Sequence, residues 1–387
     1  MRIALVIFSF FPSKTTGPIR HIAALARGLA ERGNDVAILT SAADLPAGTP
    51  LSERTDGVKV ERLRVAWKWG HWIQCPDLRA RLVQGRFDVI HAQLYRNYFT
   101  ETAAKASRKS GVPLVITPRG SLLGYRYLGE SPVYNIPNVT FDILTRRRAL
   151  KHAVLTVTSK HEAEDAYELG IPRERVVIIP HGLDFNRLPH PSTRAESDGT
   201  KLLFVGRIAE QRNVKFLLRG FALASKSNPR LRLSIVGEPI PSRYNLHEAR
   251  YWREVVRLAS QLRLGERVEF LGGAGGDALW NLYQTHDSFV YTSRYDNFGH
   301  ALVEAAYFGL PVVSTDVGVA ADLIQDGRGG ILLNPDDDVG LAEAILRISR
   351  DSTFRSRCSS FIRQQTVRYT LARNVEAYEN LYKTLVT

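Results

Sequence analysis

The sequence predicts an α/β fold built on parallel sheets, with the chain divided into two such domains. Residues Tyr291–Gly318 read as a strand, a turn, a helix and a second short strand, which is the repeating unit of a parallel sheet. Residues Arg2–Phe10 form a nearly continuous apolar run, as expected of a strand covered on both faces. A chain of 387 residues is too long to fold around one typical hydrophobic core, so two domains are expected.

The first half of the chain alternates between strand and helix patterns. Apolar runs bounded by turn residues predict strands, and apolar residues at helical spacing predict helices. Ser159 is a suitable N-cap for one of the helices, and Gly33 a suitable stop for another. The predicted strands are Asp35–Thr40, Val58–Val65, Phe87–His91, Val112–Pro118, Val154–Thr158 and Val176–Ile179. The predicted helices are Ile19–Glu31, Asp142–Lys151 and Lys160–Glu168, and Pro46–Asp56 is predicted to be a polar loop.

The second half continues the alternation after a polar linker at Leu188–Thr200. A helix is predicted at His300–Phe308, where Gly309 stops it, and another begins after the Pro-Asp run at Asn334–Asp338. The predicted strands are Lys201–Val205, Arg232–Gly237, Val268–Gly272, Phe289–Ser293 and Leu310–Ser314. These patterns place the domains at residues 1–188 and 189–368, followed by an amphipathic C-terminal helix within 369–387.

The positive charge of the chain is concentrated in its first half. Residues 1–188 hold 27 Lys and Arg against 17 Asp and Glu, a net charge of +10, whereas residues 189–387 hold 25 against 22, a net charge of +3. A basic half is typical of proteins that bind anionic membranes or nucleic acid. Trp67, Trp69 and Trp72 with Lys68 form a candidate segment for a membrane interface or an acceptor, and the basic helix around Arg146–Arg148 is a second one.

Cysteine usage and hydropathy favour a cytoplasmic protein. Cys75 and Cys358 are the only cysteines, which excludes a disulfide framework and a cysteine metal site and fits a reducing compartment. The apolar N-terminal run is short and lacks a cleavage site, so it is interpreted as a strand. Because no stretch is apolar enough to span a bilayer, we expect a cytoplasmic protein that is at most peripheral on the inner face of the membrane.

Two carboxylates lie close together in the central segment. On one continuous helix, Asp296 and Glu304 would be separated by about 12 Å of rise. The break at Asn297–Gly299 instead places both near a helix N-terminus, where free N–H groups suit a phosphate and the carboxylates suit sugar hydroxyls.

This segment resembles the E-x7-E signature of the family-4 retaining glycosyltransferases, with Asp296 in place of the first Glu and with Phe298-Gly299 as the usual filling. The resemblance implies the GT-B architecture, in which two Rossmann-like domains face each other across a cleft. The domain at residues 1–188 would then bind the acceptor and the domain at 189–368 the nucleotide-sugar, while the last helix crosses back to the first domain.

Several residues of the second half match further motifs of the family. Gly206-Arg207 and Arg212 stand where the family has G-R-x-x-x-x-K-G, with Arg212 replacing Lys and Asn213 replacing Gly. Two cations at the mouth of a parallel sheet suit a departing diphosphate. By resemblance, Asp296 and the backbone of Phe298, Gly299 and His300 hold the sugar, Glu304 binds the ribose, and the turn at Leu271 and Gly272 meets the base.

Four residues of the first half also match family positions. Gly17 stands where the family has two adjacent glycines near the donor phosphates, but Pro18 replaces the second and has no N–H. His91 ends a strand and is expected to face the cleft, and His181 belongs to a P-H-G-x-D turn at the domain junction. Arg119 replaces the usual His, as in a subgroup that acts on polysaccharide or glycolipid acceptors. Because Arg cannot act as a base, we expect Arg119 to hold the leaving phosphate or an anionic acceptor.

These observations favour a hexosyltransferase that moves a sugar from a nucleotide-sugar to a hydroxyl of a lipid-linked glycan or polysaccharide, and the resemblance implies that the transfer proceeds with retention. Neither a metal ion nor a cofactor is expected, and no nucleic acid. A dinucleotide-binding G-x-G-x-x-G is missing after the first strand of each domain, which argues against nicotinamide and flavin enzymes. Two alternatives remain open: a sugar-nucleotide 2-epimerase of the same fold, and a non-catalytic basic protein that binds membrane or nucleic acid.

Overall fold

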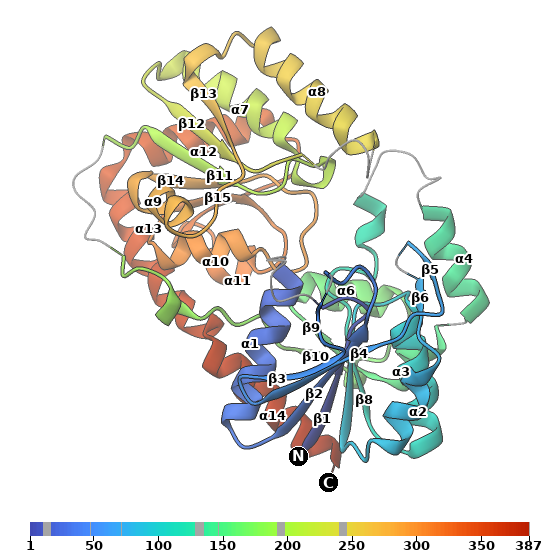
Figure 1. The fold of residues 1–387 in the computed structure, drawn as a ribbon. Helices are drawn as coiled ribbons and strands as arrows, with labels where there is room; N and C mark the ends of the chain where they lie inside the picture. Colours follow the sequence, from blue (N-terminus) through green and yellow to red (C-terminus); the bar gives the residue numbers. More distant parts are fainter. Residues whose placement is uncertain are drawn as a thin grey trace. The chain divides into compact units, whose positions relative to one another are not determined.

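The computed structural model describes residues 1–10, 17–46, 48–70, 72–127, 135–145, 147–191, 198–239 and 246–386. The chain forms two compact units, each built around its own sheet (Figure 1). The first unit comprises Met1–Tyr125, Val133–Phe185 and Tyr369–Thr387, and the second comprises Arg126–Pro132 and Asn186–Arg368. The α/β fold with parallel sheets that the sequence predicts is thereby confirmed.

The sheet of the first unit has eight strands, all parallel except β3, which pairs antiparallel with β4. In spatial order the strands are β10 (Val176–Ile178), β9 (Val154–Val157), β8 (Leu114–Thr117), β7 (Val89–Gln93), β1 (Arg2–Val6), β2 (Asp35–Ser41), β4 (Val58–Leu63) and β3 (Ser52–Thr55). A separate antiparallel hairpin is formed by β5 (Trp67–Trp69) and β6 (Trp72–Gln74).

Both faces of this sheet are covered, as the apolar run of β1 predicts. Ile3 and Leu5 point into one hydrophobic core, which the helices α1 and α14 help to form, and Ala4 and Val6 point into the other. This alternation is the two-residue period of a strand. The helices of the unit are α1 (Gly17–Glu31), α2 (Asp77–Gln84), α3 (Tyr98–Ser110), α4 (Ile136–Thr145), α5 (Arg148–His152), α6 (Lys160–Glu168) and α14 (Leu371–Val386).

Two local predictions for the first unit are wrong. The expected loop at Pro46–Asp56 contains the edge strand β3, and the expected single helix at Asp142–Lys151 is two helices, α4 and α5. Arg147 separates these helices, since its backbone is left-handed with φ 52°. By contrast, Ser159 caps α6 as predicted, accepting a hydrogen bond from the backbone N–H of Glu162.

The second unit has a six-stranded parallel sheet. In spatial order its strands are β13 (Val268–Gly272), β12 (Arg232–Val236), β11 (Lys201–Val205), β14 (Ser288–Tyr291), β15 (Val312–Thr315) and β16 (Gly330–Leu333). The helices are α7 (Val214–Ser227), α8 (Leu246–Gln261), α9 (Asp277–Thr285), α10 (His300–Tyr307), α11 (Ala320–Ile324), α12 (Asp338–Arg350) and α13 (Ser352–Gln365). Within the described ranges, the helices are all too short or too polar to cross a membrane.

Each sheet has one point where the order of strands reverses. In the first unit the chain builds outward from β1, with β2 on one side and β7 on the other, and in the second unit it builds outward from β11, with β12 and β14 as neighbours. Ligands of open α/β sheets bind at such a point, beyond the carboxyl ends of the strands. The loops that follow these strands are therefore where functional residues are expected.

Candidate functional site

A buried ion pair lies at the reversal point of the second sheet. Arg212 comes from the segment after β11 and Asp296 from the loop after β14, the two central neighbouring strands. Nη1 of Arg212 contacts the Asp296 carboxylate and also donates to the hydroxyls of Tyr291 (2.5 Å) and Ser293 (3.2 Å). The side chains of Arg212 and Asp296 are only 18% and 10% exposed. Nε of Arg212 is buried and has no hydrogen-bond partner among the described residues.

The pair keeps both of its members ionised. Burial alone would raise the pKa of Asp296, but the Arg212 charge and hydrogen bonds from Tyr291, Arg212 and the Phe298 N–H outweigh it, so the pKa is lowered. For Arg212, burial acts to lower the pKa, and the Asp296 charge raises it above its ordinary value. The site therefore holds a fixed and largely buried guanidinium whose charge does not depend on pH in the physiological range.

The backbone around Arg212 explains the Asn that follows it. Arg212 ends a short 3₁₀ helix, η5 (Glu210–Arg212), and Asn213 turns the chain into α7 with a left-handed backbone at φ 51°. Asn tolerates this conformation better than most residues, so it can stand where the resembling motif has Gly. Nδ2 of Asn213 also donates to Asp336 (3.0 Å), which anchors the turn.

The loop that carries Asp296 ends at the N-terminus of α10. Gly299 directly precedes the helix at φ 90°, a left-handed value that suits glycine. The Phe298 N–H donates to Asp296 (3.2 Å), its carbonyl accepts from Val319 N–H (3.0 Å), and its ring is 4.9 Å from that of His300. Further along α10, the half-buried Glu304 accepts a hydrogen bond from the Tyr283 hydroxyl (3.0 Å).

The other predicted residues of this unit lie at the carboxyl ends of strands or directly after them. Gly206 follows β11 and touches the backbone after β12, where a Cβ on Gly237 would come 1.9 Å from the Gly206 carbonyl oxygen. Leu271 is 37% exposed near the end of β13, and Gly272 accepts from the Gly237 N–H (2.8 Å). Arg207 is exposed, whereas the side chain of Arg212 is largely buried.

A second polar cluster surrounds Arg119 in the first unit. Nε of Arg119 donates to Gln93 Oε1 (2.7 Å), Nη1 to His181 Nε2 (3.1 Å) and Nη2 to His21 Nδ1 (2.9 Å). None of these three partners carries a carboxylate, and the side chain is nearly buried, with the residue 8% exposed. Burial lowers the pKa of Arg119 to about 10, so it stays cationic near neutral pH. Gly17, also predicted for this region, is the first residue of α1.

The hydrogen bonds fix the tautomer of His21. The Nδ2 of Asn374 donates to the Pro180 carbonyl (2.6 Å), which leaves its Oδ1 facing His21 Nε2 at 3.2 Å. Because Arg119 can only donate, Nδ1 of His21 must be the unprotonated nitrogen that accepts its hydrogen bond. Nε2 of His21 must then carry the proton, which it donates to Asn374 Oδ1. The orientation of Arg119 is therefore set by a chain of contacts that runs back to α14.

His91 lies deeper than the sequence led us to expect. It is fully buried, with Nδ1 at 2.6 Å from the Tyr382 hydroxyl and Nε2 at 2.7 Å from that of Thr117. Gln93 donates to the same Nε2 (2.9 Å) while its oxygen accepts from Arg119. Burial, together with the nearby Arg119 charge, lowers the pKa of His91 to about 3. Its contact with the Arg119 region thus runs through Gln93.

Sequence reasoning missed most of the residues that hold Arg119. Fully buried Glu162 accepts hydrogen bonds from the N–H of Gly120 and from the N–H and hydroxyl of Thr158, fixing the turn at Arg119 (φ 55°). The spacing Ser159-x-x-Glu162 is a capping-box pattern that could have identified it. No local signal points to Gln93, His21 or Asn374.

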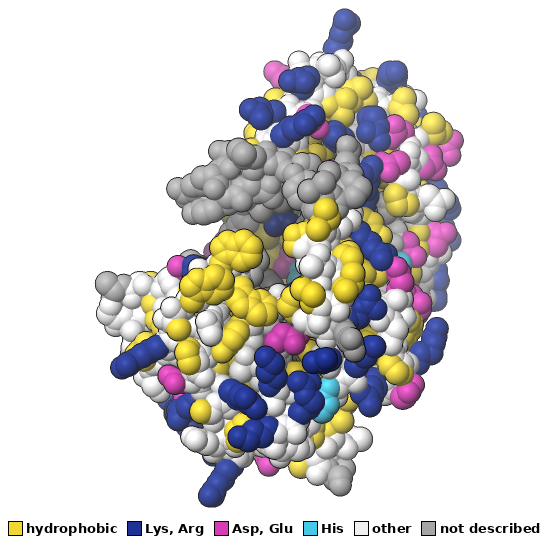
Figure 2. All heavy atoms as spheres, turned by 90° about the vertical axis from the view of Figure 1, so that its right-hand side faces the viewer, with side chains coloured by type: hydrophobic (Ala, Val, Ile, Leu, Met, Phe, Trp, Pro, Cys, Tyr) yellow, Lys and Arg dark blue, Asp and Glu magenta, His cyan; other side chains and the backbone are white. Residues whose placement is uncertain are grey.

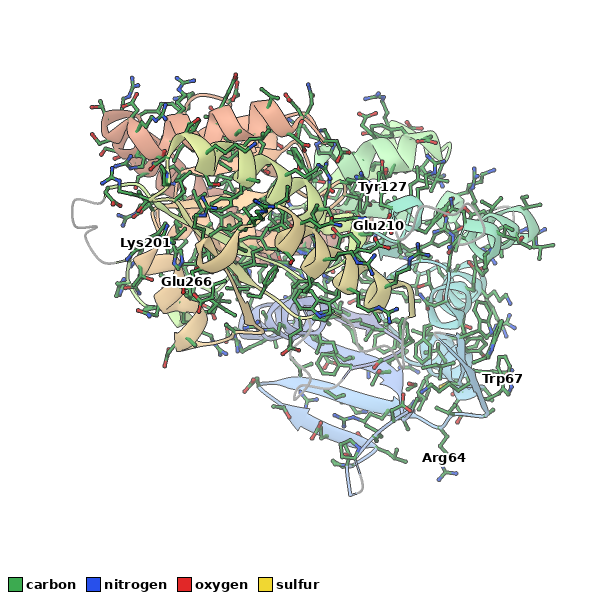
Figure 3. All side chains as sticks on the ribbon, turned by 90° about the horizontal axis from the view of Figure 1, so that it is seen from above. Arg64, Trp67, Tyr127, Lys201, Glu210 and Glu266 are labelled. Atoms are coloured by element: carbon green, nitrogen blue, oxygen red, sulfur yellow. The ribbon has the colours of Figure 1, made fainter. Side chains whose placement is uncertain are left out.

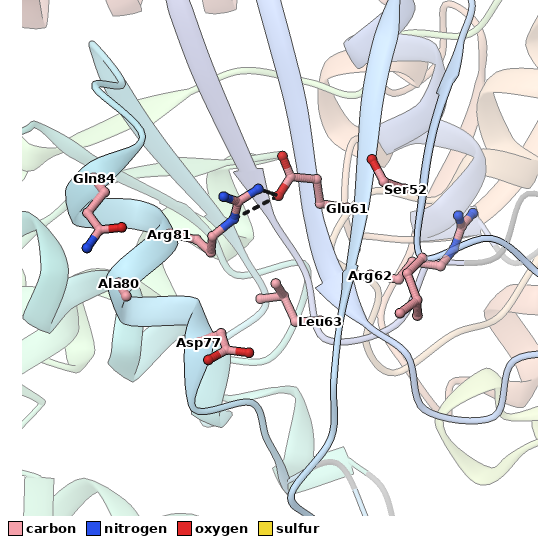
Figure 4. A pocket seen from close by; sticks show the side chains of 9 residues that line it. Ser52, Glu61, Arg62, Leu63, Asp77, Ala80, Arg81 and Gln84 are labelled. Atoms are coloured by element: carbon pink, nitrogen blue, oxygen red, sulfur yellow. Dashed lines mark hydrogen bonds and ion pairs between the residues drawn. The ribbon is translucent and has the colours of Figure 1, made fainter.

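A separate hollow of about 370 Å³ lies between α2, the edge strand β3 and its neighbour β4 (Figure 4). It is lined by Glu61, Arg62, Asp77 and Arg81 among others, and Arg81 is bound to Glu61 across it. None of the residues that line it belongs to the predicted sites. It lies at the edge of the sheet, whereas both polar clusters lie at the points of strand reversal.

Two family models match the chain, one for each half. Residues 16–182 match the glycosyl transferase 4-like domain, and residues 188–365 match glycosyl transferases group 1. Among curated proteins, a glycogen synthase of Mycobacterium tuberculosis is 25% identical over 391 residues, covering 94% of this chain and 90% of the relative.

Solved structures give the same result for the fold. A sucrose-phosphate synthase from Thermosynechococcus elongatus superposes with a TM-score of 0.76 at 20% identity, covering 99% of this chain and 98% of the other. Anabaena HepE in complex with UDP-glucose gives a TM-score of 0.73 at 20% identity, covering 99% and 100%. Together with the motif around Asp296 and Glu304, these matches show that the chain belongs to the group 1 glycosyltransferases, family 4, with the GT-B fold.

Proposed function

We propose that the protein transfers a hexose from a nucleotide-sugar to a hydroxyl of a lipid-linked glycan or polysaccharide precursor, with retention and without a metal ion. The observation that carries this proposal is the buried Arg212–Asp296 pair at the strand reversal of the second sheet. A fixed and largely buried guanidinium stabilises negative charge that develops on a leaving phosphate. The UDP-glucose bound by HepE makes a UDP-linked hexose the first donor to test.

Each residue has a stated role in this mechanism. Arg212 and Arg207 bind the diphosphate as it leaves, helped by the N–H groups at the start of α10. Asp296 and the backbone of Phe298, Gly299 and His300 hold the sugar hydroxyls, and Glu304 binds the ribose. Gly206, Leu271 and Gly272 shape the nucleotide pocket. The departing phosphate itself takes the proton of the acceptor hydroxyl.

The first unit receives the acceptor in this proposal. Arg119 is cationic and nearly buried, and its three hydrogen-bond partners Gln93, His181 and His21 carry no carboxylate, so in this proposal its guanidinium binds an anion. A phosphate that links a glycan to its lipid carrier has the matching charge. His181 and His21 orient Arg119, and His91 supports it through Gln93. Such an acceptor places the protein at the cytoplasmic face of a membrane.

Donor binding is tested by thermal shift with UDP, GDP and ADP and then with their sugar conjugates. One nucleotide should raise the melting temperature by mass action. Arg212→Ala should abolish this shift and lower the transfer rate by about 100-fold or more. Because Arg212→Ala leaves Asp296 buried and unpaired, Arg212→Lys serves as a variant that keeps the charge and the fold.

Arg219→Ala is the matched control, since Arg219 pairs with Asp336 and Asp338 in the same unit, outside the buried pair. Full turnover by a folded Arg212→Ala variant would refute the proposal. Conversion of the donor into its 2-epimer without any acceptor would instead identify an epimerase.

A further inference from the structure

Helix α4 exposes a largely apolar face, on which Thr140 is an exposed polar residue. Ile136, Val139 and Ile143 are 58%, 43% and 68% exposed, and their spacing of three and four residues places them on one side of the helix. Leu144, 75% exposed, extends this face. The helix has one charged residue, Asp142, which is buried and paired with Arg96 on the inner side (2.7 Å). A surface helix normally turns such a face to the core.

The β5–β6 hairpin adds two tryptophans to this face. Trp67 and Trp69 are 51% and 76% exposed, and because side chains alternate along a strand they share one side of the hairpin. Trp69 pairs with Trp72, whose ring therefore lies on that same side and packs edge-on against Phe141 of α4, with centroids 5.9 Å apart. The hairpin and α4 thus form one surface.

We call this surface the apolar patch; it consists of Trp67, Trp69, Ile136, Val139, Ile143 and Leu144. Figure 2 looks onto this side of the molecule and shows hydrophobic side chains gathered there, with Lys and Arg side chains below them. In Figure 3, Trp67 and Arg64 both lie at the periphery of the first unit. Contiguous exposed apolar areas of this kind mark interaction surfaces.

The segments that carry the apolar patch are strongly basic. Residues 64–74 and 135–152 hold six cationic side chains against the single carboxylate of Asp142, a net charge of +5. The cations are Arg64, Lys68, Arg146, Arg147, Arg148 and Lys151. Arg64, Arg148 and Lys151 are exposed in the structure. Asp142 is bound to Arg96 and Arg147, and Lys68 pairs with Asp44, which lies outside these two segments. The positive charge of the surface therefore comes mainly from Arg64, Arg148 and Lys151.

We propose that the apolar patch docks the protein on an anionic phospholipid membrane. Indole rings favour the headgroup layer, the aliphatic side chains of α4 enter the acyl boundary, and the surrounding cations are attracted to anionic lipids. A second copy of this chain fits less well, because a symmetric contact through the same patch would bring two basic surfaces together. The inference does not depend on the proposed donor chemistry.

The test is co-sedimentation of the purified protein with vesicles of phosphatidylcholine alone or mixed with phosphatidylglycerol. We expect binding to the mixed vesicles that weakens with salt, together with a blue shift of the tryptophan emission. The double variant Trp69→Ser/Leu144→Ser should lose about tenfold or more in vesicle affinity, since two large apolar side chains no longer enter the bilayer. Arg148→Glu should weaken binding only to the anionic vesicles.

Val339→Ser is the matched control, because Val339 is 60% exposed on α12 of the second unit and should leave vesicle binding unchanged. Equal vesicle binding by wild type and the double variant would overturn the proposal. So would a concentration-dependent dimer that the double variant abolishes, seen by analytical ultracentrifugation without vesicle binding. The thermal shift with nucleotides is measured on the wild type and on the same variants. If no nucleotide shifts the melting temperature of the wild type, this counts against the proposed function and not against membrane docking.

Discussion

One of the three hydrogen bonds that hold Arg119 depends on the tautomer of His21, which Asn374 sets. We predict that Asn374→Asp lowers kcat/KM by about tenfold near pH 6, because a carboxylate favours the doubly protonated imidazole, whose Nδ1–H cannot accept from Arg119. Raising the pH removes the extra proton, so this part of the loss should diminish toward alkaline pH, whereas the part caused by losing the Asn374 donor to the Pro180 carbonyl should not depend on pH. The measurement is a pH profile of kcat/KM.

Asn380→Asp, exposed on the same helix, is the control for the added charge. Its pH profile should follow that of the wild type. A loss in Asn374→Asp that stays constant across the pH range would contradict the tautomer argument and leave only a packing defect. A fall in melting temperature without any change in the profile would lead to the same conclusion.

Motif spacing predicts the charged residues of the two clusters but not the residues that hold them. Arg212 and Asp296 could be selected from the sequence because each lies a fixed number of residues from a strand end. His21 and Asn374 are 353 positions apart, and only the pairing of α1 with α14 brings them together. The burial of His91 could not be predicted for the same reason, since Tyr382 and Tyr378 cover it from α14.

The loop before α10 is held in place by the turn that opens α11. Gly318 has φ 57°, and a Cβ there would come 2.4 Å from the Phe298 carbonyl oxygen. We predict that Gly318→Ala displaces the Asp296–Gly299 loop and weakens nucleotide-sugar binding at least about tenfold. Isothermal titration with the donor measures the change. Gly327→Ala is the control, because Gly327 has a similar positive φ of 76° with no atom within 4 Å of the added methyl. Equal donor affinity in the two variants would contradict the prediction.

Strands with apolar runs could be predicted almost to the residue, whereas exposed polar elements could not. The strands at Lys201–Val205 and Val268–Gly272 have the predicted bounds because their own side chains specify them. The mostly exposed residues Ser52–Thr55 have the composition of a loop, and they form a strand only because they pair with the edge of β4. The break at Arg147 depends on contacts with distant residues, since its guanidinium donates to the Leu169 carbonyl (2.9 Å).

The last helix completes the first unit, so the chain begins and ends in the same compact unit. Helix α14 packs against α1 and supplies Val375, Tyr378 and Tyr382 to the core beneath β1. It also supplies Asn374 to the Arg119 cluster. The stability of this unit and the orientation of Arg119 therefore both depend on α14. The buried carboxylate of Glu379 on this helix binds Arg32 and Asn34, and so attaches the helix to the rest of the unit.

Glu379 should make the stability of the protein sensitive to acid. Hydrogen bonds from Asn34, Arg32 and Lys383 outweigh the effect of burial and lower its pKa from 4.5 to about 2. A carboxyl whose pKa is lower in the folded state stabilises the protein above its unfolded pKa, and this contribution is lost as the pH falls from 4.5 toward 2. The full shift corresponds to about 3 kcal/mol. Because Arg32 and Lys383 are about half exposed, we expect about 1–2 kcal/mol.

We therefore predict that Glu379→Gln lowers the free energy of unfolding by about 1–2 kcal/mol at pH 7, and that the difference from wild type shrinks as the pH falls from 4.5 toward 2. Urea denaturation at a series of pH values measures both curves. Glu376→Gln, which removes an exposed carboxylate from the same helix, should follow the wild type throughout. If the Glu379→Gln and wild-type curves stay parallel down to pH 3, the ion pairs of Glu379 do not fasten α14 to the first unit, and the acid sensitivity of the fold has another source.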